Sequence, residues 1–253
     1  MWTCVDAHLL LHALSLSLSL SFFPLRHRVA EPPKLYAFGE GVGSHPGTFL
    51  VAGNTVTPKG PPSIPGHFFA GTCALDGTRS GPAVESFGNG TVFHGNYDAD
   101  KRSGAGSITF ADGSQYTGAF QDGVFHGQGT LRTGQSVFEG TWANGYLNGH
   151  ATVREASGLV CEGEFSHGRR NGFCKVTYPS GAVYEGNWVN DKKQGEGTQT
   201  WPSGLTYKGS WKDGKQHGPG VMRLPSGRTM QGTWEHGQPS AASAHHVRPA
   251  TTH

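Results

Sequence analysis

The chain of 253 residues contains 40 glycines and 15 prolines, and only 15% of its residues are charged, with a formal net charge of +2. Because each glycine inside a helix costs up to about 1 kcal/mol relative to alanine, this composition excludes a helical bundle. The glycines follow no triplet period, which excludes a collagen-like chain, and so weak a net charge does not favour nucleic-acid binding. A turn-rich β protein remains, and its glycines are the first place to look for a repeat.

Residues 1–33 form a leader with three open interpretations. The stretch 9–23 is largely apolar, as in the core of a secretory signal, but no Lys or Arg precedes it and serines alternate through its second half. The stretch is also short and serine-rich for a membrane span. Residues 14–25 contain only residue types that pyrimidine-only codons can encode, as expected from translation through a polypyrimidine tract near a splice site. An artefact of the gene model, a cleaved signal and an anchor remain as alternatives, and the secretory signal is not favoured.

Residues 34–68 are rich in glycine and proline and are predicted to be a linker. His45, Gly47, Phe49 and Gly53 keep the spacing of part of the repeat that follows, so a decayed half-unit is an alternative for this stretch. No strand-then-helix context follows its clustered glycines, which argues against a phosphate-binding loop.

A period of about 23 residues organises the chain from residue 69 to residue 237. Each unit begins with a pentad in which a glycine separates two mostly aromatic residues, and successive pentads begin 24, 23, 22, 23, 23, 23 and 23 residues apart. We name each unit by its first residue and count offsets from that residue as 0. Seven full units and a half-unit begin at Phe69, Phe93, Tyr116, Phe138, Cys161, Tyr184, Tyr207 and Met230.

The first half of each unit is predicted to be a β-strand that ends in a tight turn. Offsets 0, 2 and 4 carry a ring, a glycine and a second ring, and alternate residues of a strand share one face. The glycine is therefore expected to leave a slot for a ring from a neighbouring unit. Asp-Gly or Asn-Gly pairs at offsets 6 and 7, such as Asn144 and Gly145, favour the positive φ angles of hairpin turns.

The second half of each unit is predicted to be a strand with one buried face. A glycine at offset 11 precedes a small residue at offset 13 and a mostly apolar residue at offset 15, with Gln199 as the exception, and polar residues intervene. Because a lone hairpin is marginally stable in water, the units must stack. The predicted fold is all-β: an elongated antiparallel meander of stacked β-hairpin repeats that forms a single twisted ribbon.

Two units show a family resemblance most clearly. YEGNWVNDKKQGEGTQTWPSG at 184–204 and YKGSWKDGKQHGPGVMRLPSG at 207–227 resemble the MORN repeat, named for membrane occupation and recognition nexus. The match is specific over 116–237 and looser over 69–113. The sequence departs from the family pattern at Cys73, Ala151, Cys161, Cys174 and Met230.

The resemblance implies a scaffold or targeting module. Such repeats occur in cytoskeletal, flagellar and membrane-junction proteins. They also occur beside the catalytic domains of phosphatidylinositol-phosphate kinases and of a histone lysine methyltransferase, and the sequence outside the repeats has no room for such a domain.

The sequence predicts no enzyme, no cofactor and no metal site. His126 and His217 both stand at offset 10, and Glu139, Glu162 and Glu185 all stand at offset 1, so repeat position explains them better than acid–base chemistry does. The four cysteines include no CxxC pair and no zinc-ligand spacing. Removal of a leader would leave an odd number of thiols, which favours a reducing, cytoplasmic location.

Charge is unevenly distributed along the repeats. Residues 69–160 contain five basic and eight acidic residues, whereas residues 161–237 contain ten basic and seven acidic ones. Several basic residues recur at offsets 8 and 9, and units stacked in register would place them along one edge. Anionic lipid headgroups or an acidic partner would bind there, with simple solubility of the turns as the alternative. The residues of this predicted basic edge are Lys101, Arg102, Arg169, Arg170, Lys192, Lys193 and Lys215.

The rings at offsets 0 and 4 are predicted to line an aromatic groove along one face of the ribbon. Trp188 and Trp211 are expected to be half-buried anchors beside the glycine slots. The residues of the predicted groove are Tyr116, Phe120, Phe138, Trp142, Tyr184, Trp188, Tyr207 and Trp211.

Two functions from different classes fit these features. The first is a non-catalytic scaffold that binds protein partners through the groove and the strand edges, at the cytoskeleton, a flagellum or the membrane periphery. The second is a peripheral membrane module that binds anionic phospholipids, including phosphoinositides, through the basic edge. A regulatory fragment of a phosphatidylinositol-phosphate kinase is a further alternative.

The last half-unit is expected to end in an unpaired strand edge. The tail at 238–253 shows no pattern able to cap that edge and is predicted to be disordered. Because open edges invite pairing with another chain, the sequence predicts a homodimer through the C-terminal repeats.

Overall fold

The computed structural model describes residues 49–51, 54–56, 66–240 and 247–248. The predictions for the leader at 1–33, for most of the linker at 34–68 and for most of the tail lie outside the described residues. Within the described ranges, every regular element is a β-strand. No helix long and apolar enough to cross a membrane occurs in them.

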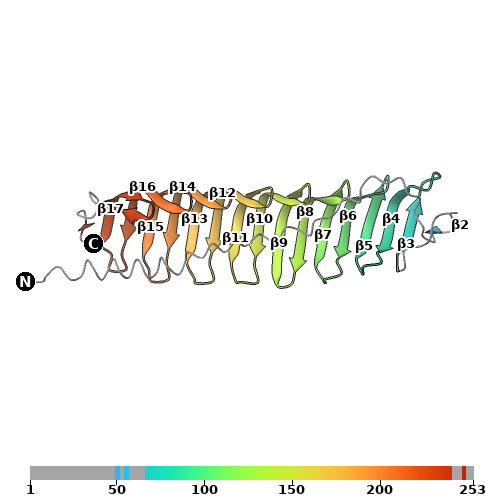
Figure 1. The fold of residues 1–253 in the computed structure, drawn as a ribbon, viewed down its shortest axis with the longest axis horizontal. Helices are drawn as coiled ribbons and strands as arrows, with labels where there is room; N and C mark the ends of the chain where they lie inside the picture. The colour runs from blue at the N-terminus through green and yellow to red at the C-terminus, as the bar shows by residue number, and fades with distance from the viewer. Residues whose placement is uncertain (1–48, 52–53, 57–65, 241–246, 249–253) are drawn as a thin grey trace, which may run out of the picture. The chain divides into compact units, whose positions relative to one another are not determined.

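The predicted all-β meander is confirmed: strands β3 to β18 form an open antiparallel sheet of 16 strands (Figure 1). Each strand from β4 to β17 pairs with the strand before it and the strand after it in sequence. In chain order the strands are β3 (Phe68–Cys73), β4 (Arg79–Ser86), β5 (Val92–Asp98), β6 (Lys101–Thr109), β7 (Gln115–Gln121), β8 (Val124–Thr133), β9 (Ser136–Ala143), β10 (Tyr146–Arg154), β11 (Val160–Ser166), β12 (Arg169–Thr177), β13 (Val183–Val189), β14 (Lys192–Thr200), β15 (Thr206–Lys212), β16 (Lys215–Arg223), β17 (Thr229–Glu235) and β18 (Gln238–Pro239).

Four short strands, two at each end, lie at the edges of this sheet. β1 (Phe49–Val51) and β2 (Asn54–Val56) form a hairpin, and β1 pairs in parallel with β3. At the other end β18 and β19 (Val247–Arg248) both pair antiparallel with β17. The expectation of an unpaired C-terminal edge, on which the predicted homodimer rested, was therefore wrong. Main-chain groups of the tail are enough to pair with β17, so no side-chain pattern was needed.

The turns inside the units have the predicted left-handed residues. Asn144 and Gly145 have φ angles of 51° and 80°, as the Asn-Gly pair requires. His167 takes the same conformation, with φ 49°, before a glycine. These turns occupy two residues, so the second strand of a unit begins at offset 8.

A register shift bends the second strand of most units. In the pairing of β13 with β14 the shift lies between Gly186 and Trp188, and Gly195 at offset 11 has a φ of 70°. An irregularity of this kind locally bends a strand and increases its twist. The predicted glycine at offset 11 is thus the residue that lets the backbone make this bend.

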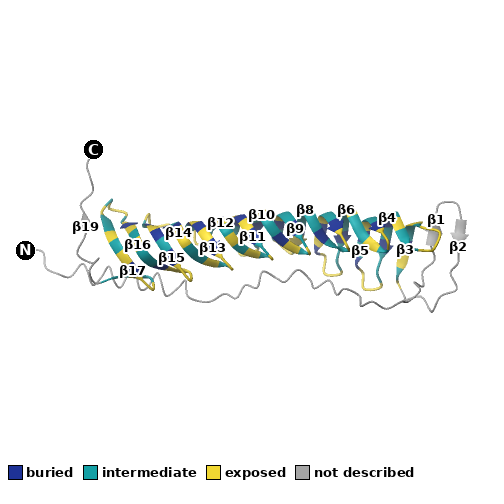
Figure 2. Cartoon of the chain, turned by 90° about the horizontal axis from the view of Figure 1, so that it is seen from above, coloured by how far each residue is buried: buried dark blue, intermediate teal, exposed yellow. Residues whose placement is uncertain are grey.

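One face of the sheet is buried and the opposite face is exposed, as the alternating bands of Figure 2 show. On β13 the residues at 184, 186 and 188 are buried, whereas those at 185, 187 and 189 are exposed. We call the face that carries offsets 0, 2 and 4 the inner face. The core lies there, and its side chains bury one another within a single described sheet.

Candidate functional site

The structure brings all eight rings of the predicted groove together on the inner face. They are buried, from Tyr116, Tyr184 and Tyr207 with no exposed surface to Phe138 at 7%. Trp188 and Trp211 are only 3% and 6% exposed, so the expectation that they would be half-buried was wrong. The rings fill the inner face as a packed core, and a ligand can reach only the side chains along its rim.

The glycine slots are filled by a ring of the same unit. A Cβ placed on Gly186, at offset 2, would lie 2.8 Å from the Tyr184 hydroxyl, and one on Gly118 would lie 2.6 Å from that of Tyr116. The Tyr184 hydroxyl donates to the Asn187 carbonyl of the same strand at 3.2 Å, which holds the ring over Gly186 of β13 and Gly197 of β14. The expectation that a neighbouring unit would fill the slot was wrong, because the tyrosine side chain is long enough to cross both strands.

Neighbouring units instead meet edge to face. The Tyr184 ring contacts Trp188 of its own unit at 5.2 Å and Trp211 of the next unit at 5.1 Å, with interplanar angles of 86° and 85°. The Trp211 Nε1 atom donates to the Gly197 carbonyl at 3.1 Å, which fixes the next unit to this one. Edge-to-face aromatic pairs stabilise a core beyond their buried area, so this zigzag of rings holds consecutive units in register.

The predicted basic edge separates into two sets of side chains. Because the second strand begins at offset 8, offsets 8 and 9 point to opposite faces. The offset-8 residues are exposed: Lys101, Arg169, Lys192 and Lys215. The offset-9 residues are partly buried on the inner face: Arg102, Arg170 and Lys193.

Two of the exposed lysines pair with a turn aspartate of the next unit. Lys101 Nζ lies 2.9 Å from Asp122 Oδ1, and Lys192 Nζ lies 3.3 Å from Asp213 Oδ1. These aspartates stand at offset 6, in the adjacent turn along the edge. Each pair lowers the positive potential that this edge presents to an anion.

The cations at offset 9 lie over the rings of the inner face. The Arg170 guanidinium lies 4.0 Å from the Trp188 ring centroid, and its Nε donates to Asp191 Oδ1 at 2.8 Å. Arg102 lies 5.5 Å from the Phe93 centroid and 5.7 Å from that of Phe87. Such cation–π contacts gain strength as water is removed from around them.

Of the three cations at offset 9, Lys193 is the most enclosed by neighbouring side chains. Its Nζ lies 4.3 Å, 4.8 Å and 5.3 Å from the ring centroids of Tyr184, Trp211 and Tyr178, and donates to Gln199 Oε1 at 2.5 Å. Burial and, to a smaller extent, the nearby charge of Arg170 together lower the pKa of Lys193 from 10.5 to about 7. Gln199, the sequence exception at offset 15, is thus the acceptor for this amine.

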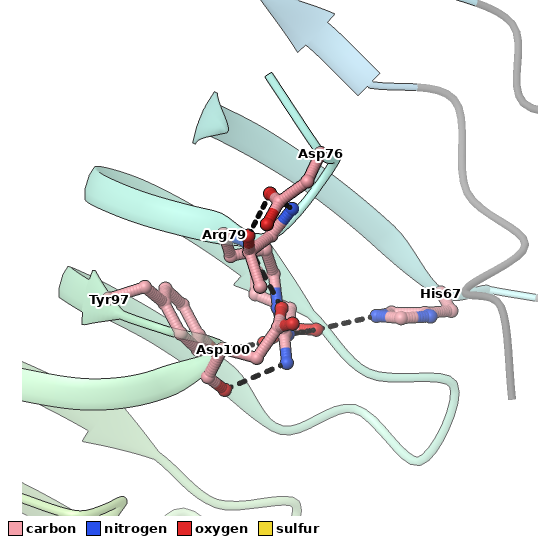
Figure 3. A network of polar contacts seen from close by, with 7 residues as sticks. His67, Asp76, Arg79, Tyr97 and Asp100 are labelled. Atoms are coloured by element: carbon pink, nitrogen blue, oxygen red, sulfur yellow. Dashed lines mark hydrogen bonds and ion pairs between the residues drawn. The ribbon is translucent and has the colours of Figure 1, made fainter. Parts of the chain in front are cut away.

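The Phe69 unit has a buried ionic network at the same two places. The first turn of this unit has one additional residue, which shifts the second strand by one offset. Arg79 therefore pairs with Cys73 in the way that Lys193 pairs with Trp188 in the Tyr184 unit. In the same way, Glu85 occupies the place of the offset-15 residue. Figure 3 shows this network. Arg79 forms ion pairs with the carboxylates of Asp100 and Glu85, and His67 contacts the same Glu85 carboxylate.

Glu85 is only 1% exposed, and its carboxylate has three polar or ionic partners. Arg79 Nη1 donates to Glu85 Oε1 at 2.8 Å, His67 Nε2 lies 2.8 Å from the same oxygen, and the Tyr97 hydroxyl donates to Oε2. Burial and the Glu85 charge raise the pKa of Tyr97. Sequence reasoning missed this cluster, because the additional residue of the first turn moves Glu85 to offset 16, where the other units have polar residues.

The middle of the sheet has apolar side chains at both places. Phe125 and Leu147 occupy offset 9, and Leu131 and Val153 occupy offset 15; all four are buried. Phe125 stacks on the Tyr116 ring at 3.7 Å with an interplanar angle of 9°. Offsets 9 and 15 therefore vary between charged, polar and apolar residues from unit to unit.

An open sheet of similar hairpins, each packed against its sequence neighbours, defines a β-repeat protein. The family model described as the MORN repeat matches residues 93–115, 116–134, 138–154, 161–183, 184–206 and 207–227. The chain belongs to the MORN-repeat family, with six repeats that span residues 93–227. The matching model is that of a repeat and not of a catalytic domain.

Several solved structures are similar to this chain. The TCP domain of SAS-4 (dCPAP) of Drosophila melanogaster, in complex with a proline-rich motif of Ana2 (dSTIL), is 10% identical with a TM-score of 0.40, over 72% of this chain and 98% of that one. The TCP10 domain of Danio rerio CPAP is 12% identical with a TM-score of 0.33, over 64% and 82%. Likeness at this level concerns the sheet alone and carries no argument about partners. No curated protein matches this chain.

Proposed function

We propose that the chain is a non-catalytic scaffold that binds an acidic, partly apolar segment of a protein partner along the rim of its inner face. The observation that carries this proposal is the guanidinium of Arg102, whose buried Nη1 has no hydrogen-bond acceptor. Arg79 and Arg170, its counterparts in other units, each donate from Nε to an aspartate at 2.8 Å.

A partner carboxylate would supply the acceptor that Arg102 Nη1 lacks. A buried N–H without a partner carries an uncompensated desolvation cost, and a charge-assisted bond to a carboxylate is among the strongest that removes it. On the inner face the guanidinium of Arg102 lies near the rings of Phe87 and Phe93. These observations support an acidic residue in the partner.

Partly exposed side chains at offset 17 supply apolar contacts along the same rim. The Phe110 ring lies 6.5 Å from the buried Phe125 ring, and Tyr178 lies beneath the amine of Lys193. The row consists of Phe87, Phe110, Tyr178, Trp201 and Leu224, each of intermediate exposure. Aromatic side chains of this kind are favoured at protein interfaces. A cytoplasmic assembly at the cytoskeleton, a flagellum or the membrane periphery is the setting that the family resemblance favours.

The second candidate is a peripheral membrane module for anionic phospholipids. The exposed offset-8 set favours it, because Lys101, Arg169, Lys192 and Lys215 recur at one repeat position and point away from the core. The ion pairs of Lys101 and Lys192 with aspartates of the next turns weaken this surface. The inner rim is therefore the stronger candidate.

A displayed peptide library tests the proposal with the full chain as bait. Selected peptides are expected to be rich in Asp or Glu beside aromatic or aliphatic residues and to bind Arg102→Met at least tenfold more weakly. Lys101→Met is the matched control, because its side chain is adjacent but points to the exposed face. Equal binding to both variants would contradict the proposal.

Vesicles that contain phosphatidylinositol bisphosphate test the second candidate. Sedimentation with these vesicles that is lost in Lys101→Met but kept in Arg102→Met would assign function to the exposed edge instead. The scaffold proposal expects no difference between the variants in this assay.

A further inference from the structure

The side chains at offsets 0 and 13 share one space on the inner face. Where offset 0 is tyrosine, offset 13 is glycine, and a Cβ on Gly197 or Gly220 would fall 2.3 Å or 2.5 Å from the tyrosine hydroxyl. Where offset 0 is phenylalanine, which lacks the hydroxyl, the offset-13 place holds alanine in two units (Phe69 with Ala83 and Phe138 with Ala151) and glycine in a third (Phe93 with Gly106). The two positions therefore compensate each other in volume.

The Cys161 unit replaces both members of this pair with cysteine. Cys161 stands at offset 0 and Cys174 at offset 13, and they are 2% and 0% exposed. A thiol at residue 161 is much shorter than a tyrosine ring, so the space that the ring fills in other units is left to the side chain of Cys174. Both cysteines are free.

The strand register directs Cys174 toward Cys161. Cys161 of β11 pairs with Val176 of β12, and Cys174 pairs with Gly163. A Cβ on Gly163 would lie only 2.8 Å from the Cys174 Cβ, so Cys174 leans over a glycine two residues from Cys161 on the same face. No side chain at 163 separates the two thiols.

The two thiols differ in acidity. The neighbouring Cys161 thiol lowers the pKa of Cys174 and the charge of Arg170 acts in the same direction, whereas burial opposes them; the Cys174 thiol itself donates to the Glu164 carbonyl at 3.2 Å. The interaction with Cys174 and burial raise the pKa of Cys161. Cys174 is thus the member that more readily becomes a thiolate, the form that attacks an oxidant.

We propose that Cys161 and Cys174 form a modification site for hydrogen peroxide, which links them in a disulfide between β11 and β12. The Cys174 thiolate attacks one peroxide oxygen, the O–O bond breaks, and hydroxide leaves as Cys174 becomes a sulfenic acid. The Cys161 sulfur then attacks the Cys174 sulfur, the S–O bond breaks, and the proton of Cys161 leaves with the hydroxyl group as water. In sum, two thiols are oxidised and one peroxide is reduced to two waters.

The burial and position of the two thiols determine which oxidant can reach them and which cysteines can be linked. A peroxide molecule is small enough to reach thiols enclosed between two strands when the sheet opens locally, whereas a bulky disulfide is not. Cys73 lies on β3, towards the other end of the sheet, and has no cysteine beside it. The link is therefore expected within the Cys161 unit and nowhere else in the described part of the chain.

Intact-mass measurement of the reduced full chain after peroxide treatment tests this site. The expected result is a loss of two hydrogen masses, with peptide mapping that joins the segment around residue 161 to the segment around residue 174. Cys73→Ser is the matched control and should form the same link. Gain of oxygen mass without loss of hydrogen, or a link that involves Cys73, would overturn the proposal.

A comparison in denaturant separates positioning by the fold from general thiol reactivity. In urea the selective link between Cys161 and Cys174 should be lost, and mixed links with Cys4 and Cys73 should appear. This measurement uses the unaltered chain, so it remains valid even if Cys161→Ser or Cys174→Ser fails to fold. An equal yield of the same link in folded and unfolded chain would contradict the proposal.

Discussion

The Phe69 unit and the Tyr184 unit solve one packing problem in different ways. Both have a cation at the offset-9 place and a polar side chain at the offset-15 place, between rings of the inner face. In the Phe69 unit the cation is a guanidinium held by two carboxylates, of Glu85 and Asp100. In the Tyr184 unit the cation is an amine held by a neutral amide and three rings. The difference teaches that a cation at this place can be held either by carboxylates or by an amide and aromatic rings.

The largest effect should come from breaking the ionic network. Arg79→Met leaves the buried Glu85 carboxylate without its guanidinium, and loss of one partner of a buried pair typically costs about 3–5 kcal/mol. Lys193→Met in the Tyr184 unit should cost far less at neutral pH, because the neutral Gln199 keeps its bonds to the Val183 and Thr200 carbonyls.

Urea unfolding, with hydrogen exchange of β3–β6 and of β13–β16, measures the two losses separately. The double variant Arg79→Met with Glu85→Leu serves as the control and should recover most of the stability. Similar losses in the two single variants would contradict the contrast between the units.

The next effect concerns the shared space of offsets 0 and 13. Gly197→Ala should lower the free energy of unfolding by about 1–3 kcal/mol, because its Cβ would meet the Tyr184 hydroxyl at 2.3 Å. The Phe69 unit already has an alanine at the equivalent place, Ala83, opposite a ring without a hydroxyl. Adding Tyr184→Phe to Gly197→Ala should therefore restore part of the loss in thermal unfolding. No restoration would show that the hydroxyl is not the clashing group.

The enclosed amine of Lys193 should make stability depend on pH. Because burial lowers its pKa from 10.5 to about 7, the unfolded chain binds more protons than the folded chain between these values. Stability should thus rise as pH rises through this window, with a slope of at most about 1.4 kcal/mol per pH unit from this group. Urea midpoints from pH 6.5 to 9.5 measure the slope, and Lys193→Met should flatten it. If the slope of stability against pH is unchanged in Lys193→Met, the pH dependence comes from other titratable groups.

The smallest effect is expected on the exposed edge. Asp213→Ala removes the partner of Lys192, and both side chains of this pair are more than half exposed. Exposed pairs contribute at most about 1 kcal/mol, so the change should be small and should vanish at high salt. Asp191→Ala should cost more, because its partner Arg170 is partly buried over Trp188. Thermal unfolding at low and high salt compares the stability losses of the two variants. An equal loss in both would show that burial of the cation does not strengthen its ion pair.

The repeat arithmetic predicted most of the fold from the sequence. Glycine at offset 2, rings at offsets 0 and 4 and the Asn-Gly turn at 144–145 each appear where the period placed them, because each is fixed by contacts within one or two units. The inward direction of Arg102, Arg170 and Lys193 was missed. A turn that ends at offset 7 implies that offsets 8 and 9 face opposite sides, so the signal was present in the sequence.

The ionic network could not be predicted in the same way. The contact of His67 with Glu85 joins residues that no periodic rule relates. The additional residue in the first turn of the Phe69 unit also shifted Arg79 and Glu85 out of the offsets at which a cation and an apolar residue were sought. The place of a residue that departs from the repeat can be assigned only when the strand register is known. The place of a residue that follows the repeat can be assigned from the sequence.

The order of the strands also decides how the chain can fold while it is being made. Every strand from β4 to β17 finds one partner in the segment that left the ribosome just before it, so no contact in this stretch has to wait for a distant part of the sequence. Closing such short loops is fast and leaves little time for misplaced pairing. The sheet can therefore grow hairpin by hairpin at its C-terminal edge during synthesis, with each new unit templated on the last.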